Sequence, residues 1–243
     1  MEKSDLNNQK IDIIFLILSA KNNKKHRDAQ KNTWLKNCPF PYFFIVGDET
    51  AQKTIIKNNT IITNCKDTEL PKKLLLAYKY INNNFSFSHA FACDDDTYVV
   101  LDRLVSCGYK KYMYMGTCYT FEKGTREGLG HAEGGAGFFL NKEAIERITQ
   151  IPLDHPILEG PSDTAIGDLA KMYNIKLRSD DRFVQGYSIK KRHGELPTPF
   201  NQKITSHYVD PDLMYKIHVQ FKQLNWRNEL SKNLKFKQLK AFL

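Results

Sequence analysis

The sequence predicts an α/β protein in which a mostly parallel, Rossmann-like central sheet is flanked by helices. Through the first hundred residues, apolar strand-like runs alternate with helical patterns, as in sheets whose parallel strands are joined by crossover helices. Three carboxylates, Asp94 to Asp96, directly follow one of these apolar runs, at the place where open α/β sheets bind their ligands. A chain of 243 residues with 41% hydrophobic residues is also long and apolar enough for one sizeable core.

The first part of the chain supplies the predicted parallel strands. Short apolar runs favour buried strands, and they occur at residues 11–19, 42–46, 61–63 and 90–93. Helical spacing of apolar side chains predicts the helices between them, over residues 26–37 and 71–82. Pro71 suits the first turn of the second helix, because its missing N–H would have no partner there in any case.

The later part of the chain mixes strands, helices and longer loops. Residues 98–105 form a helix or a strand–helix junction. Further strands are expected over residues 112–117, 138–140 and 208–209, and further helices over residues 142–150 and 162–173. Gly and charged residues predict a loop at 121–133, residues 180–202 are polar and irregular, and residues 216–242 are basic and amphipathic.

The charge and the cysteine content limit the classes of function that the sequence allows. Lys and Arg number 36 against 27 Asp and Glu, a net charge of +9, which favours anionic partners such as nucleotides, nucleic acid or acidic lipids without choosing among them. The five cysteines are widely spaced and contain no CxxC, which argues against zinc fingers and disulfide frameworks. With no apolar run of roughly 18–20 residues, we expect a cytoplasmic protein, or a Golgi luminal one if an anchor precedes this sequence.

The acidic triplet Asp94 to Asp96 is the sharpest candidate for a functional site. Adjacent carboxylates repel one another unless water or a cation offsets their charge. Oxygen ligands suit Mg²⁺ or Mn²⁺, which commonly also hold substrate phosphates. The alternative is a solvated acidic turn.

Three further features add chemistry to the triplet. Residues 133–138 form a glycine-rich turn in which Gly134 and Gly135 would let the backbone approach a ligand closely. Asp163 falls in the first turn of a predicted helix, where the helix dipole stabilises a carboxylate that could act as a general base. A neutral His207 could complete a Mn²⁺ site. A plain turn, a helix cap and a surface or core histidine are the respective alternatives.

In combination, four stretches resemble glycosyltransferase family 31, the fringe and β1,3-galactosyltransferase group. They are residues 31–34, 94–99, 134–140 and 206–210, the last followed by Met214 and Tyr215. They follow the family's order with similar spacing and span about 30–215 of the chain. Within the group, the resemblance is greatest to the core 1 β1,3-galactosyltransferases.

The resemblance implies a GT-A fold, a UDP-sugar donor and a Mn²⁺ ion, with Mg²⁺ as a substitute. It implies one domain over residues 1–243: a nucleotide-binding half at about 11–105, an acceptor half at about 106–215, and a basic helix or tail at 216–243. The acceptor would be a hydroxyl of a glycan or of a glycosylated protein or lipid.

The resemblance also implies roles for individual residues. Asp96 and His207 correspond to the metal ligands, and Asp94 and Asp95 would lie by the ribose and the metal's water shell. Asp163 corresponds to the base, although Ser162 replaces the glutamate that precedes it in the family. The family's donor-binding basic positions fall near Arg27 and Lys73. The glycine turn would lie against the donor sugar.

These roles predict an inverting β1,3-glycosyltransferase, with galactose favoured and N-acetylglucosamine or glucose left open as the transferred sugar. One alternative is an inactive relative that only binds sugar or nucleotide. A metal-dependent phosphohydrolase would need a second ligand cluster that the sequence lacks. Nucleic-acid binding is disfavoured because the basic residues are scattered and accompany no RNA or DNA motif. The basic segment from Lys216 could lie on a membrane surface.

Overall fold

The computed structural model describes residues 11–118, 127–186 and 202–221. Within these residues, the main sheet has nine strands in the order β3-β4-β2-β1-β5-β9-β7-β10-β8. The strands are β1 (Ile11–Leu18), β2 (Tyr42–Gly47), β3 (Ile55–Lys57), β4 (Thr60–Thr63), β5 (Phe87–Asp94), β7 (Tyr114–Gly116), β8 (Glu127–Gly128), β9 (Phe138–Asn141) and β10 (Leu177–Ser179). Six of the nine run in one direction, and β3, β8 and β9 run against them. The predicted mostly parallel sheet is confirmed.

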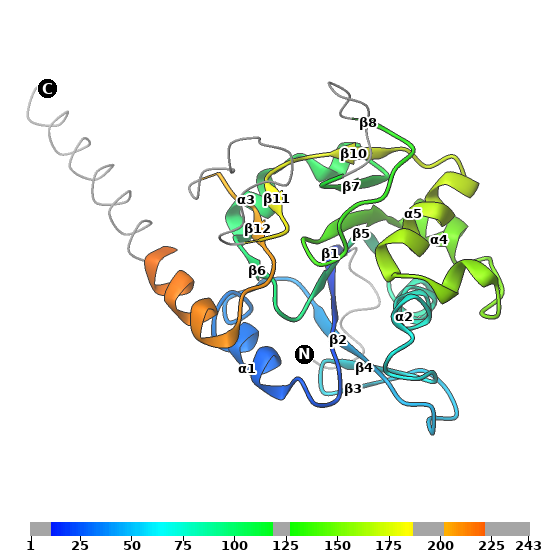
Figure 1. Ribbon diagram of the computed structural model, residues 1–243, viewed down its shortest axis with the longest axis horizontal. Coiled ribbons are helices and arrows are strands. Elements are labelled where there is room, and N and C mark those ends of the chain that lie inside the picture. Colours follow the sequence, from blue (N-terminus) through cyan, green and yellow to red (C-terminus); the bar gives the residue numbers. More distant parts are fainter. Residues whose placement is uncertain (1–10, 119–126, 187–201, 222–243) are drawn as a thin grey trace, which may run out of the picture.

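Helices cover both faces of this sheet (Figure 1). The helices α2 (Leu70–Asn84), α4 (Lys142–Ile148) and α5 (Ser162–Met172) pack on one face through an apolar cluster that includes Leu74, Ile145 and Ile166. The other face is covered by α1 (Lys24–Asn32), α3 (Leu101–Ser106) and a helix over residues 211–221, with Trp34 and Met214 in their shared core. Because strand side chains alternate between faces, β1 supplies both cores.

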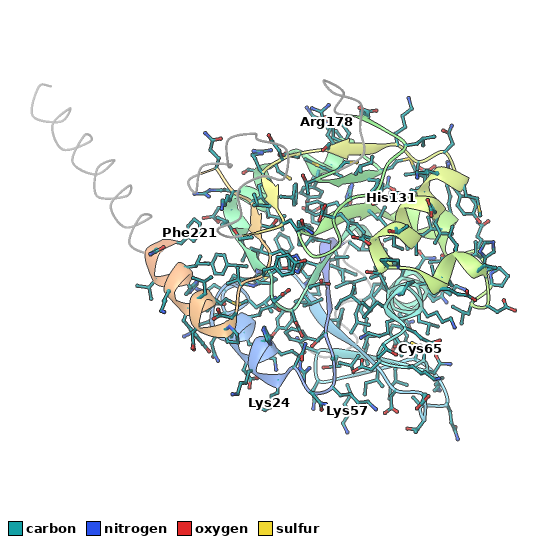
Figure 2. All side chains as sticks on the ribbon, in the orientation of Figure 1. Lys24, Lys57, Cys65, His131, Arg178 and Phe221 are labelled. Carbon is teal, nitrogen blue, oxygen red and sulfur yellow. The ribbon has the colours of Figure 1, made fainter. Side chains whose placement is uncertain are left out.

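A second sheet links the end of the described chain to its middle. It has three strands in the order β11-β12-β6, namely β6 (Tyr98–Val99), β11 (Phe183–Val184) and β12 (Thr205–Ser206). After β12, the helix at 211–221 returns along α1 (Figure 1), and Phe221 stacks on Tyr98 at 5.6 Å between ring centroids. Figure 2 shows Phe221 at the end of this helix and His131 beside α4 and α5, on the other side of the sheet.

Several sequence predictions need correction. The strand expected at 208–209 is wrong: Tyr208 has a positive φ of 56°, which breaks an extended conformation, and the strand is β12 just before it. The first helix ends at Asn32, not at 37. The short strands β3, β8, β10 and β11 were not expected, since segments of two or three residues carry little periodicity. Much of the predicted loops at 121–133 and 180–202, and residues 222–243 of the basic segment, lie outside the described residues.

Two short 3-10 helices complete the described fold, at Tyr109–Lys111 between α3 and β7 and at Pro156–Glu159 between α4 and α5. In the described part of the chain, no helix has both the length and the apolar character needed to cross a bilayer.

Candidate active site and metal centre

The acidic triplet lies at the carboxyl edge of the main sheet. Asp94 is the last residue of β5 and pairs with Leu18, the last residue of β1. The antiparallel strand β9 begins at the same edge, since Phe138 pairs with Ala92. The glycine turn that precedes Phe138 is therefore brought to the triplet by strand register, although some forty residues separate the two in sequence.

His207 reaches the triplet through the small sheet. Ser206 at the end of β12 pairs with Tyr98 at the start of β6, so the residue that follows β12 comes opposite the acidic loop. The Val209 N–H donates to the carbonyl of Asp96 at 2.9 Å, and the His207 N–H donates to the carbonyl of Val184 at 2.9 Å. Backbone pairing on both sides thus fixes the position of His207.

Asp94, Asp96 and His207 form a cluster whose ligand atoms all lie within 4.8 Å of one another. His207 Nε2 is 3.0 Å from Asp96 Oδ1 and 3.6 Å from Asp94 Oδ2. Two carboxylates with one imidazole suit a divalent ion such as Mn²⁺, which accepts oxygen and nitrogen ligands. The residues present therefore fit the metal that the resemblance implies.

The electrostatics of the cluster also favour a cation. Loss of hydration raises the pKa of Asp94 to about 7; His207 opposes this shift, whereas the charges of Asp96, Asp95 and Asp163 add to it. Burial lowers the pKa of His207, but its hydrogen bond and charge interaction with Asp96 outweigh burial, so that this pKa is raised. Like charges crowded in a partly buried site are stabilised by positive charge, whether a proton or a metal supplies it.

Asp163 lies in the first turn of α5, as predicted. One of its carboxylate oxygens accepts a hydrogen bond from the Thr164 N–H at 2.8 Å, and the other accepts one from the Gly134 N–H at 3.4 Å. A Cβ at Gly134 would lie 3.2 Å from Asp163 Cβ. Gly134, which donates to Asp163, is followed by Gly135, which packs against His207, so the glycine turn links Asp163 to the acidic cluster.

The glycine turn makes room for side chains of the site. A Cβ at Gly135 would lie 1.9 Å from His207 Cε1, so only glycine leaves space for the imidazole ring. The Gly135 carbonyl accepts a hydrogen bond from Thr97 Oγ1 at 2.5 Å, and the Ala136 carbonyl accepts one from Thr205 Oγ1 at 2.6 Å. Within residues 133–138, Gly137 is the glycine with positive φ, at 89°. A contact of Gly134 or Gly135 with a donor sugar stays a prediction.

Asp95 points into the fold rather than into the cluster. Its carboxylate accepts hydrogen bonds from Ser19 Oγ at 2.6 Å and from Asn23 Nδ2 at 3.4 Å. Burial raises the pKa of Asp95, and these two hydrogen bonds act against that shift. Arg27 donates to Ser19 Oγ at 2.9 Å and to the carbonyls of Ala20 and Lys21. Arg27 and Asp95 therefore brace the loop after β1, and their direct contact with a donor stays a prediction.

Lys73 is fully buried and paired. Its ammonium group donates to the carbonyl of Ser19 at 2.6 Å, and to the carbonyl and Oδ1 of Asp67 at 2.9 Å each. Asp67 also accepts hydrogen bonds from the N–H groups of Gly47 at 2.7 Å and Lys21 at 2.8 Å. With all three donor positions of the ammonium used, the structure supports a positioning role for Lys73. Direct contact with a donor stays a prediction and would require this ion pair to open.

Two residues of α1 and its C-terminal turn support the acidic loop in a way that the sequence did not indicate. Gln30 Nε2 donates to the carbonyls of Asp94 at 3.2 Å and Thr97 at 2.9 Å, and Trp34 Nε1 donates to that of Thr97 at 3.2 Å. Trp34 lies in a stretch that carries the family resemblance, but a sequence motif does not reveal which carbonyl it contacts. The role of Asp67 was also missed, because a lone aspartate in a loop gives no signal.

Comparison with known proteins agrees with this arrangement. The Fringe-like family matches residues 8–192, more than half of the chain, and this range includes the triplet, the glycine turn and Asp163. The chain belongs to the Fringe-like family. This confirms the predicted resemblance to the fringe group. His207 lies beyond the matched range.

Two of the solved structures similar to this Fringe-like protein are glycosyltransferases. One is involved in the glycosylation of the major capsid of PBCV-1; it has a TM-score of 0.52 and 10% identity, over 86% of this chain and 99% of that one. Another is GlyE of Streptococcus pneumoniae TIGR4, with a TM-score of 0.49 and 11% identity, over 93% of this chain and 64% of that one. At such identities, the first likeness bears on the fold alone. The predicted α/β fold of the GT-A type is confirmed, and family and fold support a glycosyltransferase.

Proposed function

We propose that this Fringe-like protein is an inverting, metal-dependent glycosyltransferase that uses a UDP-sugar donor. The observation that carries the proposal is the cluster of Asp94, Asp96 and His207 at one sheet edge, which the glycine turn links to Asp163. Galactose is the favoured sugar, the acceptor is a hydroxyl of a glycan or glycosylated molecule, and the product is a β1,3 linkage. These finer assignments rest on the resemblance to family 31.

Asp94, Asp96 and His207 would hold the divalent cation, Mn²⁺ by preference with Mg²⁺ as a substitute. When bound, the cation supplies positive charge that offsets the negative charge developing on the departing nucleotide. Gln30 and Trp34 keep the backbone of the acidic loop in place through the carbonyl of Thr97. The protein thereby fixes two of the three ligands before any substrate binds.

Asp163 acts as the general base in this mechanism. Its carboxylate accepts the proton of the acceptor hydroxyl while the acceptor oxygen forms a bond to the anomeric carbon. The bond from that carbon to the diphosphate oxygen breaks, and its electron pair leaves with UDP. Attack from the face opposite UDP converts an α-linked donor into a β-linked product, with the same one-displacement logic as inverting glycoside hydrolysis. The Gly134 N–H and the helix N-terminus orient the carboxylate.

The decisive experiment measures UDP release with Mn²⁺ across a panel of UDP-sugars, with and without simple sugar acceptors. For the donor that is turned over, Asp163→Asn should lower the rate by roughly 10²–10⁴-fold, the usual contribution of a general base. Binding of UDP with Mn²⁺ should stay within about twofold of the wild type, because the base does not contact UDP in this mechanism.

Asp154→Asn is a matched control, because Asp154 is an exposed carboxylate away from the site. A wild-type rate in Asp163→Asn would remove Asp163 from the mechanism. If UDP bound with Mn²⁺ but no donor or acceptor in the panel gave release, the result would favour a binding protein that retains only the nucleotide site.

A further inference from the structure

The imidazole of His207 lacks the support that metal-binding histidines usually have. Such a histidine normally donates its second ring N–H to a carboxylate, a carbonyl or water, which fixes the ring orientation. Here Nε2 faces the two aspartates, whereas the buried Nδ1 has no hydrogen-bond partner within the part of the chain that the structure describes. Apart from the contact of Nε2 with Asp96, the orientation of the ring must therefore come from packing.

Gly135 supplies one side of that packing. A Cβ at Gly135 would lie 1.9 Å from Cε1, 2.2 Å from Nδ1 and 2.3 Å from Nε2 of His207. Near-equal distances to three ring atoms put this position over a face of the ring, because a position beyond the ring edge would be clearly closer to one atom. The backbone of Gly135 thus lies against one face of the imidazole and is itself held by Thr97 Oγ1.

Tyr208 supplies the other side. Its ring stacks on that of His207 with centroids 3.9 Å apart and planes inclined by 22°. Since Gly135 already occupies one face, the phenol ring must lie on the opposite one. Tyr208 remains 56% exposed, so this stacking is not a by-product of burial in the core.

The backbone of Tyr208 is strained to achieve this position. Its φ of 56° lies in the left-handed region, which is unfavourable for a bulky residue. The other non-glycine residues with positive φ in the described ranges are Asn58, Asn59 and Asn174, and asparagine tolerates this region well. Strain that persists at a functional site points to a role that outweighs it.

We propose that Tyr208 is a positioning residue that clamps the His207 imidazole against Gly135 and so sets the affinity of the cluster for its divalent cation. The proposal rests on the metal site of the proposed function. The ring face of Tyr208 carries the effect, and its hydroxyl group does not.

The test is a titration of the intact protein with Mn²⁺ alone, in which the electron paramagnetic resonance of free Mn²⁺ reports binding. Tyr208→Ala and Tyr208→Gly should weaken Mn²⁺ binding by roughly 10- to 100-fold, as is typical when a residue that orients a ligand is lost. Tyr208→Phe should bind within about twofold of the wild type, because it retains the ring. Tyr208→Gly should also raise the melting temperature of the metal-free protein, since glycine adopts a positive φ without strain.

A substitution on the other face of the imidazole tests the clamp independently. Gly135→Ala should weaken Mn²⁺ binding to a similar extent, because its Cβ would force the ring aside. Gly160→Ala is the matched control, since a Cβ there meets no atom within 4 Å. Melting curves of every variant show whether it is folded.

The outcomes separate this proposal from the metal site itself. Wild-type binding that disappears in Asp96→Asn supports the metal site, and unchanged Mn²⁺ affinity in Tyr208→Ala and Tyr208→Gly would then overturn the clamp alone. A loss in Tyr208→Phe equal to that in Tyr208→Ala would also overturn it, because the hydroxyl would be the active part. Absence of Mn²⁺ binding in the wild type, or its persistence in Asp96→Asn, would overturn both.

Discussion

Two charged regions lie at the same edge of the sheet and differ in how their charges are balanced. Around Lys73, opposite charges pair, and each hydrogen of the ammonium group has an acceptor in Ser19 or Asp67. Around Asp96, like charges gather, and the pKa of Asp94 is raised. In the first region every charge has a partner within the protein, whereas the like charges of the second region would be stabilised by added positive charge, from a proton or a metal. This difference distinguishes charged residues that stabilise the fold from charged residues proposed to bind a ligand.

The comparison predicts its largest effect in the complete region. Asp67→Ala should lower the free energy of unfolding by about 3–5 kcal/mol, because it leaves the buried ammonium of Lys73 without its counter-charge. Urea unfolding followed by the fluorescence of the buried Trp34 measures this loss. Asp12→Ala, which breaks the exposed pair with Lys110, should cost no more than about 1 kcal/mol. Equal losses in the two variants would mean that the buried pair contributes no more to stability than the exposed pair.

A second prediction concerns the region that needs a cation. Mn²⁺ at a hundredfold excess over its dissociation constant should stabilise the wild type by about 2.7 kcal/mol. Asp96→Asn should lose this gain while its metal-free stability stays within about 1 kcal/mol of the wild type, because the lost attraction to His207 and the relieved repulsion from Asp94 oppose each other. Chemical unfolding with Mn²⁺ and with a chelator gives both values. A large loss in the metal-free state would make Asp96 a structural residue.

A third prediction is a pH dependence of the metal-free protein. The folded state holds the Asp94 proton more tightly than the unfolded state, since its pKa is raised from 3.8 to about 7. Ionisation of Asp94 between about pH 4 and 7 therefore lowers stability as the pH rises. Asp94→Asn removes this contribution, so its stability relative to the wild type should increase from pH 5 to pH 8. A difference that is constant over this range would contradict the raised pKa.

Asp67 should respond with the opposite sign. Burial favours its protonated form, but the hydrogen bonds from Gly47, Lys21 and Lys73 outweigh burial and lower its pKa. Its contribution to stability is therefore present above the pKa of the unfolded chain and is lost in more acidic solution. Measuring the free energy of unfolding over one series of pH values therefore compares the two aspartates directly.

The sequence predicted the long strands and helices better than the pairing between segments that are far apart in the chain. Alternating apolar runs located β1, β2, β5 and α2, because a buried strand or helix several residues long has a clear period. The triplet and Asp163 could be placed at a strand end and a helix start for the same reason. These are local properties of the chain.

Long-range pairing could not be read in the same way. The two-residue strands β6 and β12 carry no period, yet their register delivers His207 to Asp96. A strand was expected at residues 208–209, whereas Tyr208 has a positive φ in the structure. Lys73 was assigned to the donor from the family resemblance. Its burial could not be predicted, because it depends on a partner, Asp67, that no pattern identifies.

The position of His207 late in the sequence has a consequence for the order in which the site forms during folding. Asp96 and His207 are more than a hundred residues apart in the sequence, so closing the cluster requires a long chain segment to be ordered first, at an entropic cost. During synthesis, the aspartates emerge well before their histidine partner. If the proposed site binds its cation with full affinity only when His207 is in place, metal binding would report that the late-synthesised segment has docked.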